Sequence, residues 1–350
     1  MMLTDPHDGL LAIDTHVDIP WPNGPSPFEN GARCVDLPKL RAGRVAAVCF
    51  AAYVPQGPRD QAGHEAATAR ASAMLDAITA MAPADGSGGV LATTASAVEA
   101  AFAARKIAII PAIENGYALG TDLGLLDRFA QRGIRYITLT HNGHNEVADA
   151  AIPRRDLNDA EAEHGGLSAF GRAVIARMNQ LGILVDVSHA AKSTMMQAAA
   201  CSATPILATH SCVRALCDHP RNLDDEQLDM LKATGGLAQI TIVSGFLRPK
   251  ARSADLTVAN IADHVDYAVN RMGIDHVGIG TDFDGGGGVH GFMNAAQAPH
   301  LTAELAKRGY DRESLQKIWG GNFLRVLRQA EAVRSGVSEE REELLFVHKK

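Results

Sequence analysis

Short apolar runs rich in β-branched residues alternate with Ala/Leu-rich stretches of helical periodicity along most of this chain. Such alternation is typical of βα units that surround a parallel sheet. Most of the runs are continuously apolar, as expected of strands buried on both faces. Eight strands are predicted, at Leu10–Thr15, Val45–Tyr53, Lys106–Ile113, Ile134–Thr140, Gly182–Ser188, Pro205–Thr209, Gly236–Val243 and His276–Thr281.

Between these strands, apolar residues recur at helical spacing. The predicted helices include Gln61–Met81, Leu123–Arg132, Ser168–Leu181, Asp224–Thr234 and Val258–Met272. Proline and glycine predict a long loop over Trp21–Gly31 and an irregular connection over Ala82–Gly89. A last helix is predicted over Asn322–Ala332, followed by a charged, mobile tail at about residues 333–350.

Eight βα units favour a closed (β/α)8 barrel of the metal-dependent hydrolase type over an open, doubly wound sheet. A length of 350 residues would often mean two domains, but such barrels commonly exceed about 250 residues as one domain. No linker composition interrupts the pattern, and no G-x-G-x-x-G motif opens a helix after the first strand. The sequence therefore predicts a single TIM-barrel catalytic domain, with Gly285–Gly288 as a flexible active-site loop.

Charge and apolar patterning argue against nucleic-acid and membrane partners. The net charge is −7, and no Lys/Arg cluster is interleaved with aromatic residues. The longest apolar stretches, such as Val45–Val54, fall far below the roughly 20 residues that span a bilayer. Neither a signal peptide nor a lipid-anchor motif is recognised. The five cysteines form no C-x-x-C pair, which favours a reducing, cytoplasmic location.

Ionisable side chains follow six of the predicted strands. In a barrel, the active site forms where strands end and βα loops begin. The residues at these positions are His16, Asp18, Glu114, His141, His189, His210 and Asp282. A lone histidine in such a place is more often a hydrogen-bonded loop residue. Together, however, these groups would suffer repulsion and desolvation unless a cation offset the cost, so a metal centre is predicted.

The residue types suggest how the ligands divide. His16 and Asp18 stand at i and i+2 in extended chain, so both side chains emerge on one side. Glu114 could bridge two cations through its two oxygens, and His189 and His210 could supply neutral nitrogens to a second ion. This set of N and O ligands without thiolate favours zinc, with manganese or cobalt as substitutes.

Several motifs resemble, in order and spacing, the membrane (renal) dipeptidase family of zinc peptidases in the amidohydrolase superfamily. The resemblance covers roughly residues 10 to 330 and fits the bacterial branch, since no anchor, disulfide or secretion signal is visible. The motifs are Asp14-Thr15-His16-Val17-Asp18, Ile113-Glu114-Asn115-Gly116, Thr138-Leu139-Thr140-His141-Asn142, Asp186-Val187-Ser188-His189, Thr209-His210-Ser211, Arg221-Asn222 and Gly280-Thr281-Asp282-Phe283-Asp284-Gly285.

The resemblance implies a binuclear zinc centre and a role for each of its ligands. Glu114 would bridge the two ions, His16 and Asp18 would complete one, and His189 and His210 would complete the other. A hydroxide shared between the ions would attack a peptide carbonyl.

Three further residues would handle the substrate. His141 would polarise the carbonyl and stabilise the oxyanion, and Arg221 would bind the C-terminal carboxylate of a short peptide. Asp282 would shuttle a proton or hold the free amine, with Asp284 as the competing candidate. The other conspicuous histidines keep structural or solvent-facing interpretations, namely His144, His219, His264, His276 and His290.

The leading hypothesis is a zinc-dependent dipeptidase that cleaves the single amide of a dipeptide, with a D-amino acid at the second position left open. The first alternative keeps the metal centre but acts on an N-acyl amino acid, a cyclic amide or a lactone. The second alternative is a non-catalytic binding protein on the same scaffold. A homodimer is consistent with the family resemblance alone.

Overall fold

Eight parallel strands form a nearly closed barrel, which confirms the predicted fold class. The computed structural model describes residues 5–19 and 24–347. In the sheet the strands follow the order β1-β2-β4-β5-β6-β7-β8-β9, and a short β3 pairs with β4 outside this path. Their bounds are β1 Ala12–Asp18, β2 Val45–Tyr53, β3 Val90–Leu91, β4 Ala108–Glu114, β5 Tyr136–Thr138, β6 Leu184–Asp186, β7 Leu207–Ser211, β8 Leu237–Ile240 and β9 Val277–Ile279.

Hydrogen bonds between the first strand and the last strand bring the two edges of the sheet together. The Thr15 hydroxyl donates to the Ile279 carbonyl at 2.7 Å, and the Asp282 amide donates to the His16 carbonyl at 2.9 Å. All eight predicted strands are present within a few residues of their expected ends. The sequence missed β3, because two residues are too few to form a recognisable pattern.

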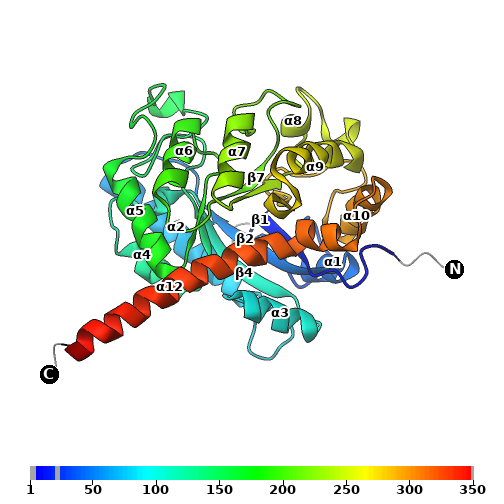
Figure 1. Ribbon diagram of the computed structural model, residues 1–350, viewed down its shortest axis with the longest axis horizontal. Coiled ribbons are helices and arrows are strands. Elements are labelled where there is room, and N and C mark those ends of the chain that lie inside the picture. Colours follow the sequence, from blue (N-terminus) through cyan, green and yellow to red (C-terminus); the bar gives the residue numbers. More distant parts are fainter. Residues whose placement is uncertain (1–4, 20–23, 348–350) are drawn as a thin grey trace.

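Helices surround the barrel, and Figure 1 shows them packed around the strands. Their bounds are α1 Leu37–Ala42, α2 Gln61–Ala80, α3 Ala95–Ala103, α4 Leu125–Gln131, α5 Ala169–Leu181, α6 Lys192–Cys201, α7 Asp225–Ala233, α8 Ser244–Leu247, α9 Val258–Met272, α10 Ala298–Lys307, α11 Arg312–Gln316 and α12 Asn322–Val347. The predicted starts are accurate where a side chain caps the helix. Asp60 accepts from the Gly63 amide, and Asp224 forms a capping box with Gln227.

The core divides between the outside and the inside of the barrel. Apolar faces of the helices pack on the outer side of the strands, whereas a second cluster fills the interior. This inner cluster joins Ile13, Ile110 and Leu207 on the strands to Phe323 and Leu327 on α12. The first turns of α12 thus close the interior away from the strand ends that carry the polar residues, and leave that opposite end free for a site.

The C-terminal helix departs from the prediction. It continues from Asn322 to Val347, whereas the sequence pattern ended it at Ala332 and made the remainder a mobile tail. Glutamate and arginine recur in this stretch, and both have good helix propensity. The final residues of the predicted tail, 348–350, lie outside the described residues, as do Trp21–Asn23 of the predicted loop. Residues 24–31 contain neither helix nor strand, as expected. In the described part of the chain, none of the helices combines the length and apolar character that a membrane span requires.

Candidate metal centre

The strands deliver the predicted ligands to one end of the barrel, but four of these residues lie within strands rather than after them. β1 continues through His16 to Asp18, which pairs with Ala51 of β2. Glu114 is the last residue of β4, and His210 lies inside β7. The predicted strands stopped short there because a polar residue ends an apolar run, whereas backbone pairing does not depend on polarity.

The Glu114 carboxylate lies in the middle of the cluster of predicted ligands, His16, Asp18, Glu114, His189 and His210. Its two oxygens face different histidines. Oε2 lies 3.7 Å from Nε2 of His16, while Oε1 lies 3.1 Å from Nε2 of His189 and 3.4 Å from Nε2 of His210. Burial alone would raise the pKa of Glu114, but the three neighbouring imidazoles hold the pKa of this carboxyl well below its usual value. The carboxylate is therefore ionised.

The cluster also contains buried polar atoms that the protein itself leaves without partners. Among the described residues, Nε2 of His16 and Oδ1 of Asp18 are buried with no hydrogen-bond partner, and they lie 3.7 Å apart. Burial lowers the pKa of His16, yet the neighbouring carboxylates of Asp18 and Glu114 raise that pKa well above its ordinary value overall. These carboxylates thus favour a positive charge between them, which is what a cation ligated by N and O atoms provides.

Among the described residues, three groups of side chains bring their potential ligand atoms within 4.8 Å of one another. They are His16 with Asp18 and Glu114, Glu114 with His141 and His189, and His16 with Asp186 and His210. The first two groups share Glu114, and each adds two further ligands to it. The donor atoms are imidazole nitrogens and carboxylate oxygens, so the residues present fit divalent cations such as zinc.

Sequence reasoning did not single out the residues that hold the histidines from behind. Nδ1 of His16 lies 2.9 Å from the Tyr136 hydroxyl, and Nδ1 of His189 lies 3.1 Å from Oδ1 of Asn142. Asn142 follows His141 in a quoted motif, so proximity in sequence could have indicated it. Tyr136 lies inside an apolar strand and gave no such signal.

Backbone strain marks two of the cluster's positions. His189 has φ 66° and Asp282 has φ 60°, a region that non-glycine residues seldom occupy. Backbone hydrogen bonds hold both residues, including one from the Ala151 amide to the His189 carbonyl at 2.7 Å. Gly285 then makes room for the carboxylates, because a Cβ there would lie 2.3 Å from Oδ1 of Asp282 and 2.4 Å from Oδ2 of Asp18.

The cluster opens into a cavity of about 300 Å³. It is lined by Asp18, Tyr53, Glu114, His141, Asn142, His189, Arg221, Val243, Phe246, Asp282 and Gly285. The Arg221 side chain is only 3% exposed, and its Nε has no partner among the described residues. Its Nη2 donates to the His210 carbonyl at 3.2 Å, and its guanidinium lies 5.3 Å from the ring centre of Phe246. A buried cation thus faces the cavity with spare hydrogen-bonding capacity.

Burial shifts the titration of the other cavity groups. It lowers the pKa of His141 below its usual value, so this imidazole is neutral at pH 7. Burial, and then the negative charge of Asp18, raises the pKa of Asp282 well above its usual value. Burial also lowers the pKa of Arg221 to about 10, which still leaves the guanidinium charged at neutral pH.

Asp284, the alternative to Asp282, is occupied elsewhere. Its carboxylate accepts the backbone N–H of Cys34 at 2.7 Å and that of Val35 at 3.1 Å, so it anchors the segment that follows β1. Two of the remaining histidines have structural contacts, as expected. Nδ1 of His144 accepts from the Ala150 amide at 3.0 Å, and Nδ1 of His264 accepts from the Val213 amide at 3.0 Å.

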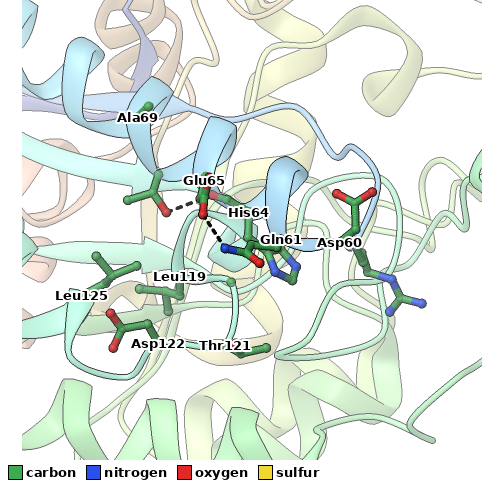
Figure 2. Close-up of a pocket in the computed structure, with 12 residues that line it drawn as sticks. Asp60, Gln61, His64, Glu65, Ala69, Leu119, Thr121, Asp122 and Leu125 are labelled. Atoms are coloured by element: carbon green, nitrogen blue, oxygen red, sulfur yellow. Dashed lines mark hydrogen bonds between the residues drawn. The ribbon is translucent and has the colours of Figure 1, made fainter.

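A larger cavity of about 680 Å³ lies apart from the metal-ligand cluster. Figure 2 shows it beside the start of α2, with Asp60, Gln61 and His64 on one side and Leu119 and Asp122 on another. None of the predicted ligands lines it. Part of its polar surface is satisfied locally, since Gln61 donates to Glu65 at 2.9 Å. The predicted ligands Asp18, Glu114 and His189 line the smaller cavity instead.

Comparison with known proteins supports the assignment of these residues to a metal centre. The sequence profile of the family described as membrane dipeptidase (peptidase family M19) matches residues 7–341. Dipeptidase verJ of Clonostachys rogersoniana is 35% identical over 317 residues, which cover 89% of this chain and 79% of that protein. Dipeptidase 3 of Mus musculus is 34% identical over 300 residues, covering 85% of this chain and 58% of that protein.

Solved structures show the same likeness in three dimensions. The probable dipeptidase PvdM from Pseudomonas aeruginosa aligns with a TM-score of 0.90 and 28% identity, covering 94% of this chain and 97% of that one. A metallo peptidase from Rhodobacter sphaeroides, liganded with a phosphinate mimic of the dipeptide L-Ala-D-Ala, aligns with a TM-score of 0.82 and 27% identity, covering 92% of this chain and 100% of that one. The chain therefore belongs to the membrane dipeptidase family, peptidase family M19, and is a metallopeptidase that acts as a dipeptidase.

Proposed function

We propose that this enzyme is a binuclear zinc dipeptidase in which Glu114 would bridge the two ions. His16 and Asp18 would complete one ion, and His189 and His210 the other. The observation that carries this proposal is the division of the Glu114 carboxylate, whose Oε2 faces His16 and whose Oε1 faces the other two histidines. When bound there, two divalent cations would polarise the substrate carbonyl and lower the pKa of a water molecule enough for attack at neutral pH.

The protonation states of the second pair of histidines favour metal binding. Imidazole binds a cation through an unprotonated nitrogen. Burial, and then the charge of Arg221, lowers the pKa of His189 well below its ordinary value. Burial, and then the charge of His16, lowers the pKa of His210 to about 3. Both side chains are consequently neutral at physiological pH and need release no proton.

Arg221 would select the substrate by its C-terminal carboxylate. A guanidinium binds a carboxylate through two parallel hydrogen bonds, and the unpartnered Nε of Arg221 faces the same cavity as the cluster. A cavity of about 300 Å³ stands at the lower end of small-molecule sites. Both features favour a very short peptide, because the carboxylate has to lie close to the scissile amide.

His141 and Asp282 would complete the chemistry on the substrate. The neutral imidazole of His141 would donate a hydrogen bond to the carbonyl oxygen and stabilise the charge that develops there. The raised pKa of Asp282 suits a carboxyl group that accepts a proton from the attacking water and passes it to the leaving amine.

For substrate stereochemistry we propose L,D-dipeptides in addition to L,L-dipeptides. The Rhodobacter sphaeroides structure, which aligns over 92% of this chain, holds a mimic of L-Ala-D-Ala. The expected homodimer and cytoplasmic location stay predictions.

The test is hydrolysis by purified protein that has been stripped of metal and then reloaded with zinc. We expect no turnover after stripping and recovered turnover of L,L- and L,D-dipeptides after two equivalents of zinc. N-acyl amino acids, cyclic amides and lactones serve as the comparison panel. Activity that survives complete metal removal, or a preference for the comparison panel, would overturn the proposal.

A further inference from the structure

The Thr209 hydroxyl lies between two of the histidines proposed to hold different ions. Its Oγ1 is 3.1 Å from Nδ1 of His16 and 2.9 Å from Nδ1 of His210. On its other side, the same hydroxyl donates to Oδ2 of Asp186 at 2.7 Å. Thr209 and Asp186 are both fully buried. Behind the cluster, one oxygen atom thus contacts two imidazoles and a carboxylate.

Donor and acceptor counting fixes the direction of these bonds. Nε2 of each histidine faces Glu114, so a cation there would bind Nε2 and leave the proton on Nδ1. A hydroxyl has one hydrogen and two lone pairs. The hydrogen of Thr209 goes to Asp186, which leaves its two lone pairs for the two imidazole N–H groups. These three contacts use every hydrogen-bonding position of the hydroxyl, and the Ser188 hydroxyl is its more distant neighbour at 3.4 Å.

Asp186 keeps the hydroxyl in this orientation. Its Oδ1 accepts the backbone N–H groups of Ser188 at 3.0 Å and Thr209 at 2.9 Å. Its Oδ2 accepts the hydroxyls of Thr138 at 2.6 Å and Thr209 at 2.7 Å. A carboxylate held by four donors acts as an acceptor, and its hydrogen bonds occupy both oxygens. Asp186 therefore supports the cluster from behind, although its position near His16 and His210 could also be taken for that of a ligand.

The two histidines depend on Thr209 to different degrees. Nδ1 of His16 has a second partner in the Tyr136 hydroxyl at 2.9 Å, which itself donates to the Thr15 carbonyl. For Nδ1 of His210, Thr209 is the only hydrogen-bond partner among the described residues. Loss of the hydroxyl would leave His16 with one acceptor and His210 with none.

We infer that Thr209 is a positioning residue that orients His16 and His210 together and that the His210 ion relies on it. This inference rests on the proposed function, because it needs the two ions that Glu114 would bridge. It assigns to the pair Thr209–Asp186 the task of fixing the imidazole tautomer at both ions. Hydrogen-bonding partners of metal ligands typically contribute about 10- to 100-fold to metal affinity.

The experiment measures zinc stoichiometry and the two dissociation constants by competition with a chromophoric chelator. Thr209→Val removes the hydroxyl at nearly constant shape. Thr138→Val is the matched control, since it removes the other hydroxyl from the same oxygen of Asp186 without contacting either histidine. We expect Thr209→Val to weaken one ion, the one assigned to His210, about 10- to 100-fold, to change the other ion less, and to regain turnover in excess zinc.

Thr209→Ser and Thr209→Ala separate the hydroxyl from packing, because both variants lack the methyl group and only serine keeps the oxygen. Thr209→Ser should bind both ions like the wild type, whereas Thr209→Ala should resemble Thr209→Val even where the metal-free proteins have equal thermal stability. If Thr209→Ser and Thr209→Ala bind zinc equally, or if Thr138→Val weakens zinc binding as much as Thr209→Val does, the role of Thr209 is overturned. Wild-type protein that holds fewer than two ions would instead contradict the proposed function, and this inference with it.

Discussion

Oε1 of Glu114 lies 3.1 Å from Nε2 of His189, although Glu114 ends β4, His189 follows β6, and β5 stands between these strands in the sheet. The carboxylate therefore reaches across the end of the barrel to meet the imidazole. This contact joins parts of the chain that are remote in sequence, and the other oxygen of Glu114 makes the corresponding approach to His16.

Replacing Glu114 by glutamine tests the shared carboxylate. The amide keeps the shape of the side chain but removes its negative charge, so we expect zinc content to fall below two ions per chain and kcat to fall at least roughly 1000-fold, equivalent to about 4 kcal/mol. Metal analysis and dipeptide turnover are the measurements. Glu146→Gln is the control, since Glu146 pairs with His64 outside the cluster, and it should retain both zinc and activity.

Replacing Arg221 by alanine tests recognition of the substrate carboxylate. We expect kcat/KM to fall about 30- to 5000-fold, mainly through KM, because a buried charge pair is worth about 2 to 5 kcal/mol. Arg214→Ala is the control in the same connection after β7, where Arg214 pairs with Asp218. For the wild type, amidating the C-terminus of the dipeptide should lower kcat/KM as much as Arg221→Ala does. In Arg221→Ala, the amidated dipeptide should show little further loss of kcat/KM. Equal losses for both substrates in the variant would argue against this contact.

Gly285→Ala tests the space between Asp18 and Asp282. A Cβ would come within 2.3 Å of one carboxylate and 2.4 Å of the other, so both must move. We expect turnover to drop at least roughly 100-fold, as misplacement of reacting groups by about 1 Å can do, while the protein stays folded. Gly245→Ala should leave turnover unchanged, because nothing lies within 4 Å of its Cβ position. Steady-state kinetics together with circular dichroism provide the comparison, and normal kcat in Gly285→Ala would refute the steric argument.

The burial of His7 leads us to expect that the folded protein loses stability in acid. It is fully buried, its Nδ1 lies 2.6 Å from the Thr302 hydroxyl, and its ring meets Trp319 edge-on. Burial, and then the charge of Arg44, lowers its pKa from 6.5 to about 4. Between these values the unfolded chain binds a proton that the folded protein excludes. The contribution is fully present above about pH 6.5 and falls by up to about 3 kcal/mol as the pH drops towards 4.

Urea unfolding at pH 7.5 and pH 5 measures this effect. His7→Asn offers an oxygen in place of Nδ1 but has no group that titrates in this range. The variant should lose less stability than the wild type over the same interval of pH. An identical pH dependence in both proteins would show that His7 does not contribute.

The barrel and the convergence of its ionisable groups could be predicted because both follow from local patterns. Continuous apolar runs mark the strands, and the rule that strand ends meet at one face brings Glu114, His189 and His210 together. The supporting partners could not be predicted in the same way. Tyr136 reaches His16 from an apolar strand that carries no polar motif, and Thr209 contacts His16 only when β1 and β7 come together.

The most direct test of the account is anomalous diffraction at the zinc edge from crystals of the metal-loaded enzyme. We expect two peaks, each about 2.0 to 2.2 Å from a different oxygen of Glu114, with His16 and Asp18 at one ion and His189 and His210 at the other. A single peak, or two peaks of which one does not contact Glu114, would contradict the bridging carboxylate.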